Sequence, residues 1–488
     1  AALVIVAASA AIRWPGFTQG GLASHDVGGI LYNAMLLRSG GLPYVDSVEW
    51  KAPGSFYVAA LVADGNDIAA LQVAANLVAL GSLVLVMALA WRLWGRGAAV
   101  ACGAVFALHD AQLDSMDANY VTWALLPQIA ALALAFAARR RPVPSVMWLA
   151  SGALCGVATL CKQPAGIVIV PVIACALRSA GKWELRAGAT VVLGFVAAHA
   201  PIGLHYLARG QLGALLASYV GADWGMAYIG HHADMPLHLA AWEGLAATVF
   251  FLALPLTLAV FATAARPRDE TASATTRLLW IWALAAIAGA AVGLRFYKGY
   301  FLAALPPLCL LAAAPWGMLA AGFWRRGVAR WLAAPVLALL VARAGVMLHA
   351  TRVDRARPHD DGARKLADHI ARHSEPGARI WVWGWHLWGV YAYSDRLSAS
   401  PIYKTPGLLT RFDDDTWRRP STPVTLIPDS PHADRLLRDL DAARPIFITL
   451  GGSVPREKFV ALRRFLLTHY ERDRRITVGK VEVWRRRD

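Results

Sequence analysis

Residues 67–91 read DIAALQVAANLVALGSLVLVMALAW, and after Asp67 this stretch contains no charged side chain. An α-helix needs about 20 such residues to cross the ~30 Å hydrocarbon core of a bilayer. Similar apolar blocks, each of roughly 17–25 residues, recur up to about Leu348, whereas charged residues become dense after Ala350. The sequence therefore predicts a polytopic α-helical membrane module over 1–349 and a soluble C-terminal domain over 350–488.

The composition supports a membrane protein and argues against a nucleic-acid partner. Hydrophobic residues make up 57% of the 488 residues and charged residues 16%, which is too little charge to cover a soluble protein of this size. The net charge is +16, but within 1–349 the arginines form short clusters after every second apolar block, as in Arg92 with Arg96 or Arg139 with Arg140. This positive-inside pattern marks cytoplasmic loops and accounts for most of the basic excess.

With these clusters as cytoplasmic markers, we predict about eleven spans and an extracytoplasmic C-terminal domain. The predicted spans are 1–13, 67–91, 98–108, 120–137, 146–161, 165–177, 187–207, 237–264, 278–293, 300–320 and 331–349. The extracytoplasmic loops are then 14–66, 109–119, 162–164, 208–236 and 294–299. The opening apolar run is short, so we expect that the chain begins inside a trimmed first helix and not with a cleaved signal peptide.

Local patterns predict elements in the long first loop and in the tail. Residues 27–38 have apolar side chains at helical spacing, which predicts an amphipathic helix on the membrane surface. The tail alternates strands at 379–384, 423–428, 444–450 and 476–484 with helices at 362–372, 433–443 and 456–469, an α/β pattern. The tryptophans Trp381, Trp383 and Trp385 fall on one face of the first strand, where a packed core or contact with the membrane fits better than sugar stacking.

The sequence offers no motif for a metal or a disulfide framework. All five cysteines lie in apolar blocks, with neither zinc spacing nor a pairing pattern, and are interpreted as small buried residues. The pair His231 and His232 has no third ligand at a suitable spacing. The sequence therefore indicates no certain cofactor, and a divalent metal stays open but has no support from the sequence.

Two acidic residues of the extracytoplasmic loops are candidates for chemistry. A positioned carboxylate such as Asp26 can take the proton from a hydroxyl that attacks a sugar. The alternative for Asp26 is that it caps a helix beginning at Val27, since aspartate is a favoured N-cap residue. Asp117 can orient a hydroxyl, and its alternative is a solvated loop carboxylate.

Four basic residues of the extracytoplasmic loops form a set that complements the two acids. Preorganised cations stabilise the negative charge that develops on a departing phosphate. The residues that could supply these cations are Lys51, Lys162, Arg295 and Lys298. Lys162 ends an apolar helix and is followed by the helix-breaking Pro164; its alternative is snorkelling to the interface. For Arg295 and Lys298 the alternative is contact with lipid headgroups.

Together these segments resemble the GT-C glycosyltransferases, closest to bacterial relatives of protein O-mannosyltransferases and of the aminoarabinose transferase acting on lipid A. The resemblance covers 1–350 and rests on residues 26–34, 40–46, 51–54, 117–120, 160–164 and 295–308. It implies a GT-C type bundle, with Asp26 as the catalytic base and Asp117 at a second acidic position. The chain has Val27 where the family often has glutamate after the aspartate, which argues further against a metal.

The resemblance also implies a function. The chain is expected to be a hexosyl- or pentosyltransferase with inverting chemistry, multi-pass in the bacterial inner membrane, that uses a polyprenyl-phosphate sugar such as an undecaprenyl-phosphate sugar. The acceptor is a lipid, a glycan or a protein. Weaker candidates for acceptor or sugar contact are Asp46, Glu49, Asn119, Tyr297 and His231. The alternative is a transporter or flippase of a lipid-linked saccharide, which should carry charges near the bilayer midplane, whereas here they gather at one face.

Overall fold

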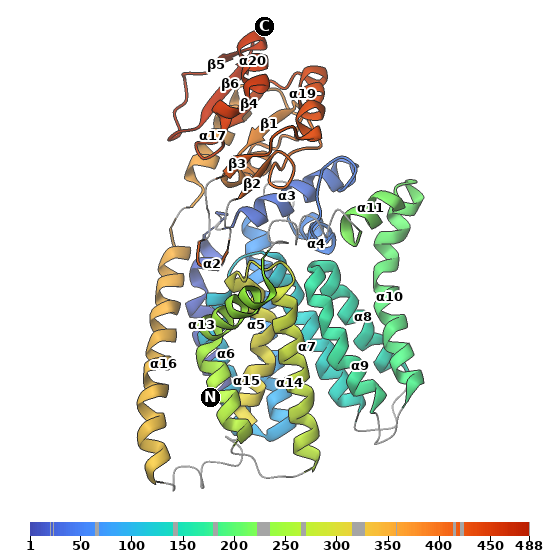
Figure 1. The fold of residues 1–488 in the computed structure, drawn as a ribbon, viewed down its shortest axis with the longest axis vertical. Helices are drawn as coiled ribbons and strands as arrows, with labels where there is room; N and C mark the ends of the chain where they lie inside the picture. The colour runs from blue at the N-terminus through green and yellow to red at the C-terminus, as the bar shows by residue number, and fades with distance from the viewer. Residues whose placement is uncertain are drawn as a thin grey trace. The chain divides into compact units, whose positions relative to one another are not determined.

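The computed structural model describes the chain from Ala1 to Arg487 except for eleven short stretches. The stretches left out are 20, 23, 64–67, 140–144, 179–183, 222–234, 265–269, 315–326, 358, 413–415 and 420–423. The chain divides into two compact units (Figure 1). Unit 1 comprises 1–19, 72–205 and 235–357, and unit 2 comprises 20–71, 206–234 and 358–488.

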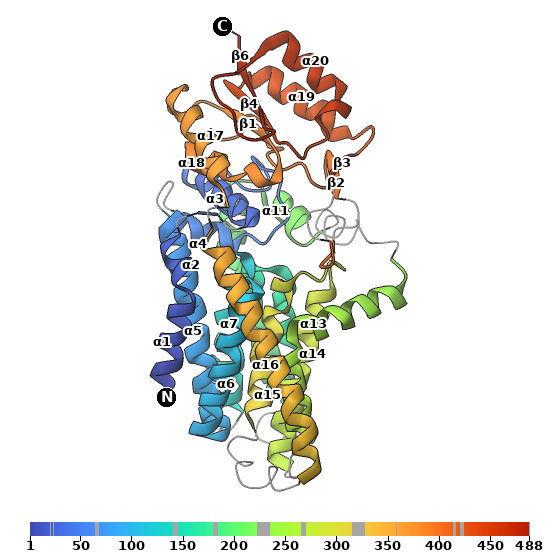
Figure 2. The same cartoon turned by 90° about the vertical axis from the view of Figure 1, so that its left-hand side faces the viewer.

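Unit 1 is a bundle of α-helices joined by short 3₁₀ helices. Helices α6 and α15 pack together and run alongside each other in Figure 2, and α14 packs on α15. The elements of the unit are α1 (Ala2–Ile12), α2 (Trp14–Thr18), α5 (Ile68–Trp94), α6 (Arg96–His109), η1 (Asp110–Leu113), α7 (Tyr120–Ala138), α8 (Ser145–Cys161), η2 (Gln163–Val168), α9 (Ile169–Leu177), α10 (Leu185–Ala208), α13 (Leu237–Ala264), α14 (Glu270–Ala291), η5 (Lys298–Ala304), α15 (Leu305–Ala313) and α16 (Gly327–Arg355).

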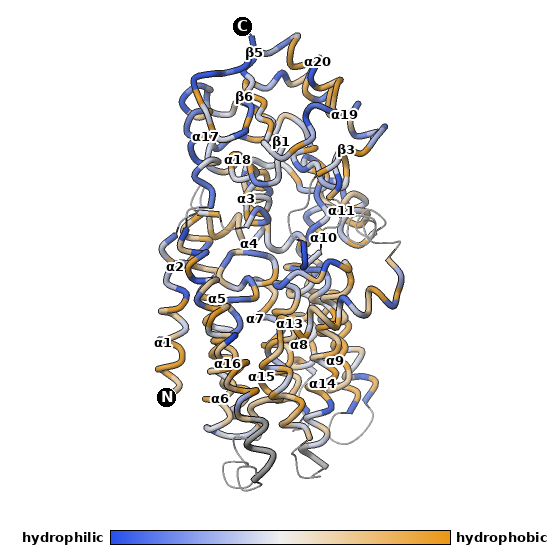
Figure 3. The backbone as a smooth tube through the Cα atoms, turned by 60° about the vertical axis from the view of Figure 1, so that its left-hand side comes forward, coloured by the Kyte–Doolittle hydropathy of each residue, from blue (hydrophilic) through white to orange (hydrophobic). Residues whose placement is uncertain are grey.

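Among the described residues, six helices are long and apolar enough to cross a membrane. They are α5, α7, α10, α13, the 273–291 part of α14 and the 334–355 part of α16. The tube in Figure 3 shows that the helices of this unit carry mostly hydrophobic residues. Four other predicted spans correspond to apolar helical stretches of 10–17 residues, such as Ser145–Cys161. The chain is thus a mostly helical, multi-pass protein, and the count of about eleven spans stays a prediction.

Small residues allow two of these helices to approach closely. A Cβ atom on Gly152 of α8 would lie 1.9 Å from the carbonyl oxygen of Val191 on α10. A Cβ atom on Gly194 of α10 would lie 2.0 Å from the carbonyl oxygen of Leu149 on α8. Glycine is therefore required at both positions for backbone-to-backbone contact, which is a common way to pack helices inside a membrane.

Unit 2 combines the first long loop with the C-terminal α/β region. Its four-stranded sheet has the order β1-β4-β6-β5, with β1 parallel to β4 and the other neighbours antiparallel, and β2 pairs with β3 in a second, antiparallel sheet. The elements are α3 (His25–Arg38), α4 (Gly54–Val62), α11 (Leu212–Tyr219), α17 (Asp361–Arg372), β1 (Ile380–Trp383), η8 (Trp385–Leu387), α18 (Gly389–Ser394), β2 (Thr410–Phe412), β3 (Val424–Leu426), α19 (Pro431–Ala443), β4 (Phe447–Leu450), η9 (Arg456–Lys458), α20 (Val460–His469), β5 (Tyr470–Arg472) and β6 (Glu482–Arg486).

The core of the α/β region lies on both faces of strand β1. Trp381 and Trp383 are fully buried with the apolar residues of α19 and α20, while Ile380 and Val382 are buried with those of α17. Successive strand residues point to opposite faces of a sheet, which explains this division. The expected core role of the first two tryptophans is confirmed, whereas Trp385 lies beyond the strand, in η8.

The helix predicted over 27–38 exists, but the prediction that it is amphipathic is wrong. All ten residues from Val27 to Leu36 are buried, because α4 and α18 pack against this helix. Gly28 is needed there, since a Cβ atom on it would lie 3.0 Å from the backbone nitrogen of Gly389 in α18. The four predicted strands and three predicted tail helices are present with shifted ends, and the short strands β2 and β5 were not predicted.

Candidate functional site

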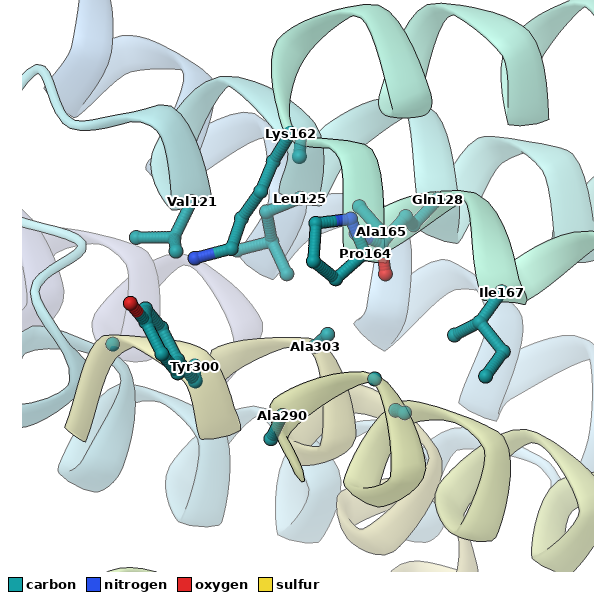
Figure 4. A pocket seen from close by; sticks show the side chains of 14 residues that line it. Val121, Leu125, Gln128, Lys162, Pro164, Ala165, Ile167, Ala290, Tyr300 and Ala303 are labelled. Atoms are coloured by element: carbon teal, nitrogen blue, oxygen red, sulfur yellow. The ribbon is translucent and has the colours of Figure 1, made fainter. Parts of the chain in front are cut away.

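Unit 1 contains a small pocket, lined mostly by apolar residues, with Lys162 at its edge (Figure 4). Its walls come from α7, η2, α14 and η5, and its lining residues are Val121, Ala124, Leu125, Gln128, Lys162, Pro164, Ala165, Ile167, Ala286, Gly289, Ala290, Gly299, Tyr300 and Ala303. The Lys162 ammonium lies 4.0 Å from the centroid of the Tyr300 ring, which the figure shows below it. A cation over an aromatic face is attracted by the ring quadrupole.

The local chain geometry explains why Lys162 projects at this position. Helix α8 ends at Cys161, and Lys162 has an extended backbone just before η2, in which Pro164 occupies the first turn. Proline cannot continue the hydrogen bonding of α8, so the chain turns here. The lysine is half-buried at the end of an apolar helix, where an ionisable group is costly unless it is paired or wet.

Asp114 and Lys298 form an ion pair beside this pocket. The distance from Lys298 Nζ to Asp114 Oδ1 is 2.9 Å, and both side chains are partly exposed. Asp114 has a left-handed backbone with φ of 64°, and a Cβ atom on Gly299 would lie 2.8 Å from its Oδ2. The ion pair and this close approach place η5, which carries Tyr300, next to the loop that precedes α7.

Asp117 is buried, with 6% of its surface exposed. Its Oδ1 accepts hydrogen bonds from Gln72 Nε2 at 2.6 Å and from the Ala118 backbone nitrogen at 3.0 Å. Its Oδ2 has no hydrogen-bond partner among the residues that the structure describes. Burial raises the pKa of the Asp117 carboxyl above its usual value, and the positive charge of Arg355 opposes this rise. Asp117 is therefore not a solvated loop carboxylate, and that alternative is wrong.

The other sequence candidates of unit 1 lie at the start of α7 and in the segment before η5. Asn119 is half-buried at the N-terminal boundary of α7. Arg295 is half-buried in the turn before η5, between Leu294 and Phe296, which both have left-handed backbones. The Tyr297 ring packs edge-on against Tyr300 at 5.7 Å between centroids.

A buried ion pair that the sequence did not reveal holds the loop containing both acids. Arg13, after α1, is fully buried and forms an ion pair with Asp110 at the start of η1. It also donates hydrogen bonds to Ser115 O at 2.9 Å, to Ser115 Oγ at 2.6 Å and to Asn76 Oδ1 at 3.2 Å. A sequence signal existed, because Arg13 is a lone arginine at the end of the first apolar block.

Asp26 lies in unit 2, in the first turn of α3. The N-cap of this helix is Ser24, whose hydroxyl accepts a hydrogen bond from the Asp26 backbone nitrogen at 3.2 Å. The interpretation of Asp26 as the helix cap is therefore wrong, and its carboxylate is not needed for that purpose. The His25 ring packs edge-on against Trp385 with a centroid distance of 4.6 Å, so the neighbourhood of Asp26 is partly aromatic.

The segment before Asp26 is anchored by Asp360. This carboxylate accepts a hydrogen bond from the Leu22 backbone nitrogen at 2.8 Å and another from the Tyr393 hydroxyl. A Cβ atom on Gly21 would lie 2.7 Å from Asp360 Oδ1, so glycine permits this approach. The start of α3 is thus tied to a residue of the C-terminal region.

Lys51 also lies in unit 2, in the turn that precedes α4. It is half-buried, and its backbone oxygen accepts a hydrogen bond from the Tyr44 hydroxyl at 2.6 Å. Glu49 is not an exposed loop acid: it is buried and bonded to Lys404. Asp46 is exposed, and its carboxylate accepts a hydrogen bond from the Leu42 backbone nitrogen at 2.7 Å. His231 lies outside the described residues.

Unit 1 thus brings Lys162 together with Tyr300, and Lys298 together with Asp114, next to Asp117. Unit 2 contains Asp26 and Lys51. The five cysteines are all buried, as expected. Over the described ranges of the chain, no group of three or more His, Cys, Asp or Glu residues is placed to hold a metal ion.

Comparison with known proteins identifies the fold. No family model and no curated protein matches the sequence. Among solved structures, ArnT from Cupriavidus metallidurans in the apo state is 15% identical, with a TM-score of 0.62 over 99% of this chain and 97% of that chain. The chain has the GT-C fold. ArnT bound to undecaprenyl phosphate matches this GT-C fold with a TM-score of 0.60.

A second GT-C protein supports the same assignment. The archaeal oligosaccharyltransferase AglB from Archaeoglobus fulgidus, in complex with an inhibitory peptide and a dolichol-phosphate, is 11% identical with a TM-score of 0.52. The match covers 92% of this chain and 69% of that chain. The expected resemblance to GT-C proteins is therefore confirmed at the level of the fold.

Proposed function

We propose that the chain is a glycosyltransferase that moves a sugar from a polyprenyl-phosphate donor to a hydroxyl acceptor. The observation that carries this proposal is the half-buried Lys162 ammonium at the edge of an apolar pocket inside a helical bundle. A polyprenyl phosphate combines an anionic head with an apolar tail. A point charge beside an apolar wall complements both parts of such a ligand.

The GT-C fold adds independent support. The ArnT structure that matches nearly the whole chain holds undecaprenyl phosphate, and the AglB structure holds a dolichol-phosphate. A polyprenyl phosphate is therefore the class of lipid that this fold accommodates in both neighbours. We assign it to this chain because the fold and the lysine at the pocket point to the same ligand.

In the proposed reaction the acceptor oxygen attacks the anomeric carbon of the donor sugar. The bond between that carbon and the phosphate oxygen breaks, and its electron pair leaves with the polyprenyl phosphate. The hydroxyl proton passes to the Asp26 carboxylate, which acts as general base. Because the displacement is a single step, the configuration at the anomeric carbon inverts, and the sugar transferred is a hexose or a pentose.

Cations stabilise the leaving phosphate in this scheme. Lys51 and Lys162 supply point charges to its oxygens, and Arg295 and Lys298 contribute to the positive potential around it. Asp117 orients the acceptor or a sugar hydroxyl, for which its Oδ2 atom is available. The side chains of Asp46, Asn119, Tyr297 and His231 stay weaker candidates for sugar or acceptor contact, whereas Glu49 is buried in its ion pair with Lys404.

Replacing Lys162 by alanine tests the donor site. Charge-assisted hydrogen bonds are worth about 1.5–3 kcal/mol, so Lys162→Ala is expected to weaken binding of undecaprenyl phosphate by more than about tenfold. The measurement is a titration of the detergent-solubilised chain with undecaprenyl phosphate, and with undecaprenol, which has no phosphate, as the comparison. Binding of undecaprenol should change little.

A matched control exists on α16. Arg343 lies 4.6 Å from the centroid of the Phe250 ring, a cation–aromatic contact of the same kind away from the pocket. Arg343→Ala should leave the affinity for undecaprenyl phosphate unchanged. Equal affinities of Lys162→Ala and wild type, with both proteins folded, would remove Lys162 from the donor site.

The membrane orientation is a separate prediction. We propose that the region after Ala350 is extracytoplasmic and that the Arg139–Arg141 loop is cytoplasmic, because arginine-rich loops stay on the cytoplasmic side. Reporter fusions at Arg140 and at Asp488 in the bacterial inner membrane are expected to report opposite sides. Two fusions that report the same side would exclude this orientation.

A further inference from the structure

A buried ion pair joins the first long loop to the C-terminal region within unit 2. Lys404 is 4% exposed and Glu49 is 2% exposed, and the Lys404 ammonium bonds to Glu49 Oε2. The same oxygen accepts hydrogen bonds from the Tyr403 hydroxyl at 2.7 Å and from Asn33 Nδ2 at 3.4 Å. Three side chains, two of them from residues 403–404, therefore fix the position of one carboxylate.

The other oxygen of Glu49 holds the backbone that leads into Lys51. Glu49 Oε1 accepts hydrogen bonds from the backbone nitrogens of Trp50 at 3.0 Å and of Lys51 at 3.2 Å. The Tyr44 hydroxyl donates to the Lys51 backbone oxygen. Both backbone polar groups of Lys51 are thus held, and the nitrogen is held by a carboxylate whose place depends on Lys404.

The Lys404 ammonium also packs against helix α3. It lies 4.8 Å from the centroid of the Trp388 ring, and a Cβ atom on Gly29 would lie 2.9 Å from its Nζ. Gly29 is three residues after Asp26 on the same helix. The lysine therefore touches the element that carries one proposed site residue and, through Glu49, fixes the turn that carries another.

We propose that Lys404 is a positioning residue for the donor phosphate site, acting through Glu49 on the backbone of Lys51. This inference rests on the proposed function, in which Lys51 contacts the phosphate. If Lys404 has this role, the C-terminal region contributes to the phosphate site. It also gives Glu49 a role in orienting Lys51 in place of contact with the sugar.

The physical basis is the cost of an unpaired buried charge. Lys404→Met keeps a long apolar side chain but leaves the Glu49 carboxylate buried without its counter-ion. Breaking a buried pair on one side is strongly unfavourable, so the carboxylate must move or bind water. Either change removes the fixed acceptor for the Lys51 backbone nitrogen and displaces the Lys51 side chain.

A double-mutant cycle on the full-length chain tests this inference, with undecaprenyl phosphate as the probe. Lys404→Met is expected to weaken binding about tenfold in the wild-type background. In the Lys51→Ala background it should cause no further loss, because its effect passes through Lys51. Lys365→Met, which changes an exposed lysine on α17 of the same unit, is the matched control and should leave binding unchanged.

Each outcome decides a separate point. An equal loss from Lys404→Met in both backgrounds would overturn the positioning role, because a general structural defect acts independently of Lys51. A Lys51→Ala protein that binds undecaprenyl phosphate like wild type would instead refute the proposed contact of Lys51 with the phosphate, and with it this inference. If Lys404→Met does not fold, Tyr403→Phe removes one hydrogen bond to Glu49 and should show the same dependence on Lys51, with a smaller loss.

Discussion

Asp26→Asn is expected to lower sugar transfer by at least ~100-fold, because general-base help is typically worth 10²–10⁴-fold. Asparagine keeps the size of the side chain and removes the basic carboxylate. The N-cap of α3 is Ser24, so the substitution does not remove the cap of the helix. Affinity for undecaprenyl phosphate should stay close to that of wild type, since the carboxylate acts on the acceptor.

Ser24→Ala is the matched control for this prediction. It removes the hydrogen bond to the Asp26 backbone nitrogen, at a cost of about 1 kcal/mol in helix stability, and leaves the carboxylate in place. The Ser24→Ala protein should therefore lose thermal stability and retain transfer. Wild-type transfer by Asp26→Asn would assign the base to Asp117, whose burial raises the pKa of its carboxyl and whose Oδ2 is available. Asp117→Asn would then be inactive.

Arg13→Met is expected to lower the free energy of unfolding by about 3–5 kcal/mol, because it leaves the buried Asp110 carboxylate without a counter-ion. Asp110 is 1% exposed, so water does not solvate its carboxylate. The expected result is a large drop in the thermal unfolding midpoint of the detergent-solubilised protein. The loop that carries Asp114 and Asp117 should lose order at the same time.

The double variant Arg13→Met/Asp110→Asn separates charge from packing. It removes both charges, and replacing both partners of a buried pair costs much less than replacing one. Its unfolding midpoint should therefore lie between those of Arg13→Met and wild type. A double variant no more stable than Arg13→Met would show that the hydrogen bonds from Arg13 to Ser115 and Asn76 dominate over the ion pair.

The sequence predicted the helical elements well because their signal is local. The apolar block 67–91, for example, extends over most of the helix that it forms, which is α5. The run of β-branched and aromatic residues at 379–384 predicted a strand for the same reason. The apolar spacing places the first helix of the loop to within two residues. The alternative in which Asp26 caps this helix is wrong, because Ser24, which is also a favoured cap residue, is the N-cap.

The networks around the site could not be predicted because their partners are distant in the sequence. Glu49 and Lys404 are 355 positions apart, and Arg13 and Asp110 are 97 positions apart. No local pattern indicates that a carboxylate in a polar loop is buried and paired. The burial of Val27–Leu36 likewise results from the packing of α4 and α18 on α3. The periodicity of α3 in the sequence does not reveal this packing.

The most direct test of the central claim is mass spectrometry of envelope lipids and glycans from a deletion strain complemented with wild type or with Asp26→Asn. A transferase predicts that the deletion strain loses one sugar from an envelope molecule and accumulates the corresponding polyprenyl-phosphate sugar. Wild type should restore the sugar, and Asp26→Asn should not. Two results would contradict the account. One is an envelope glycan profile that is identical with and without the chain. The other is full restoration of the sugar both by Asp26→Asn and by Asp117→Asn.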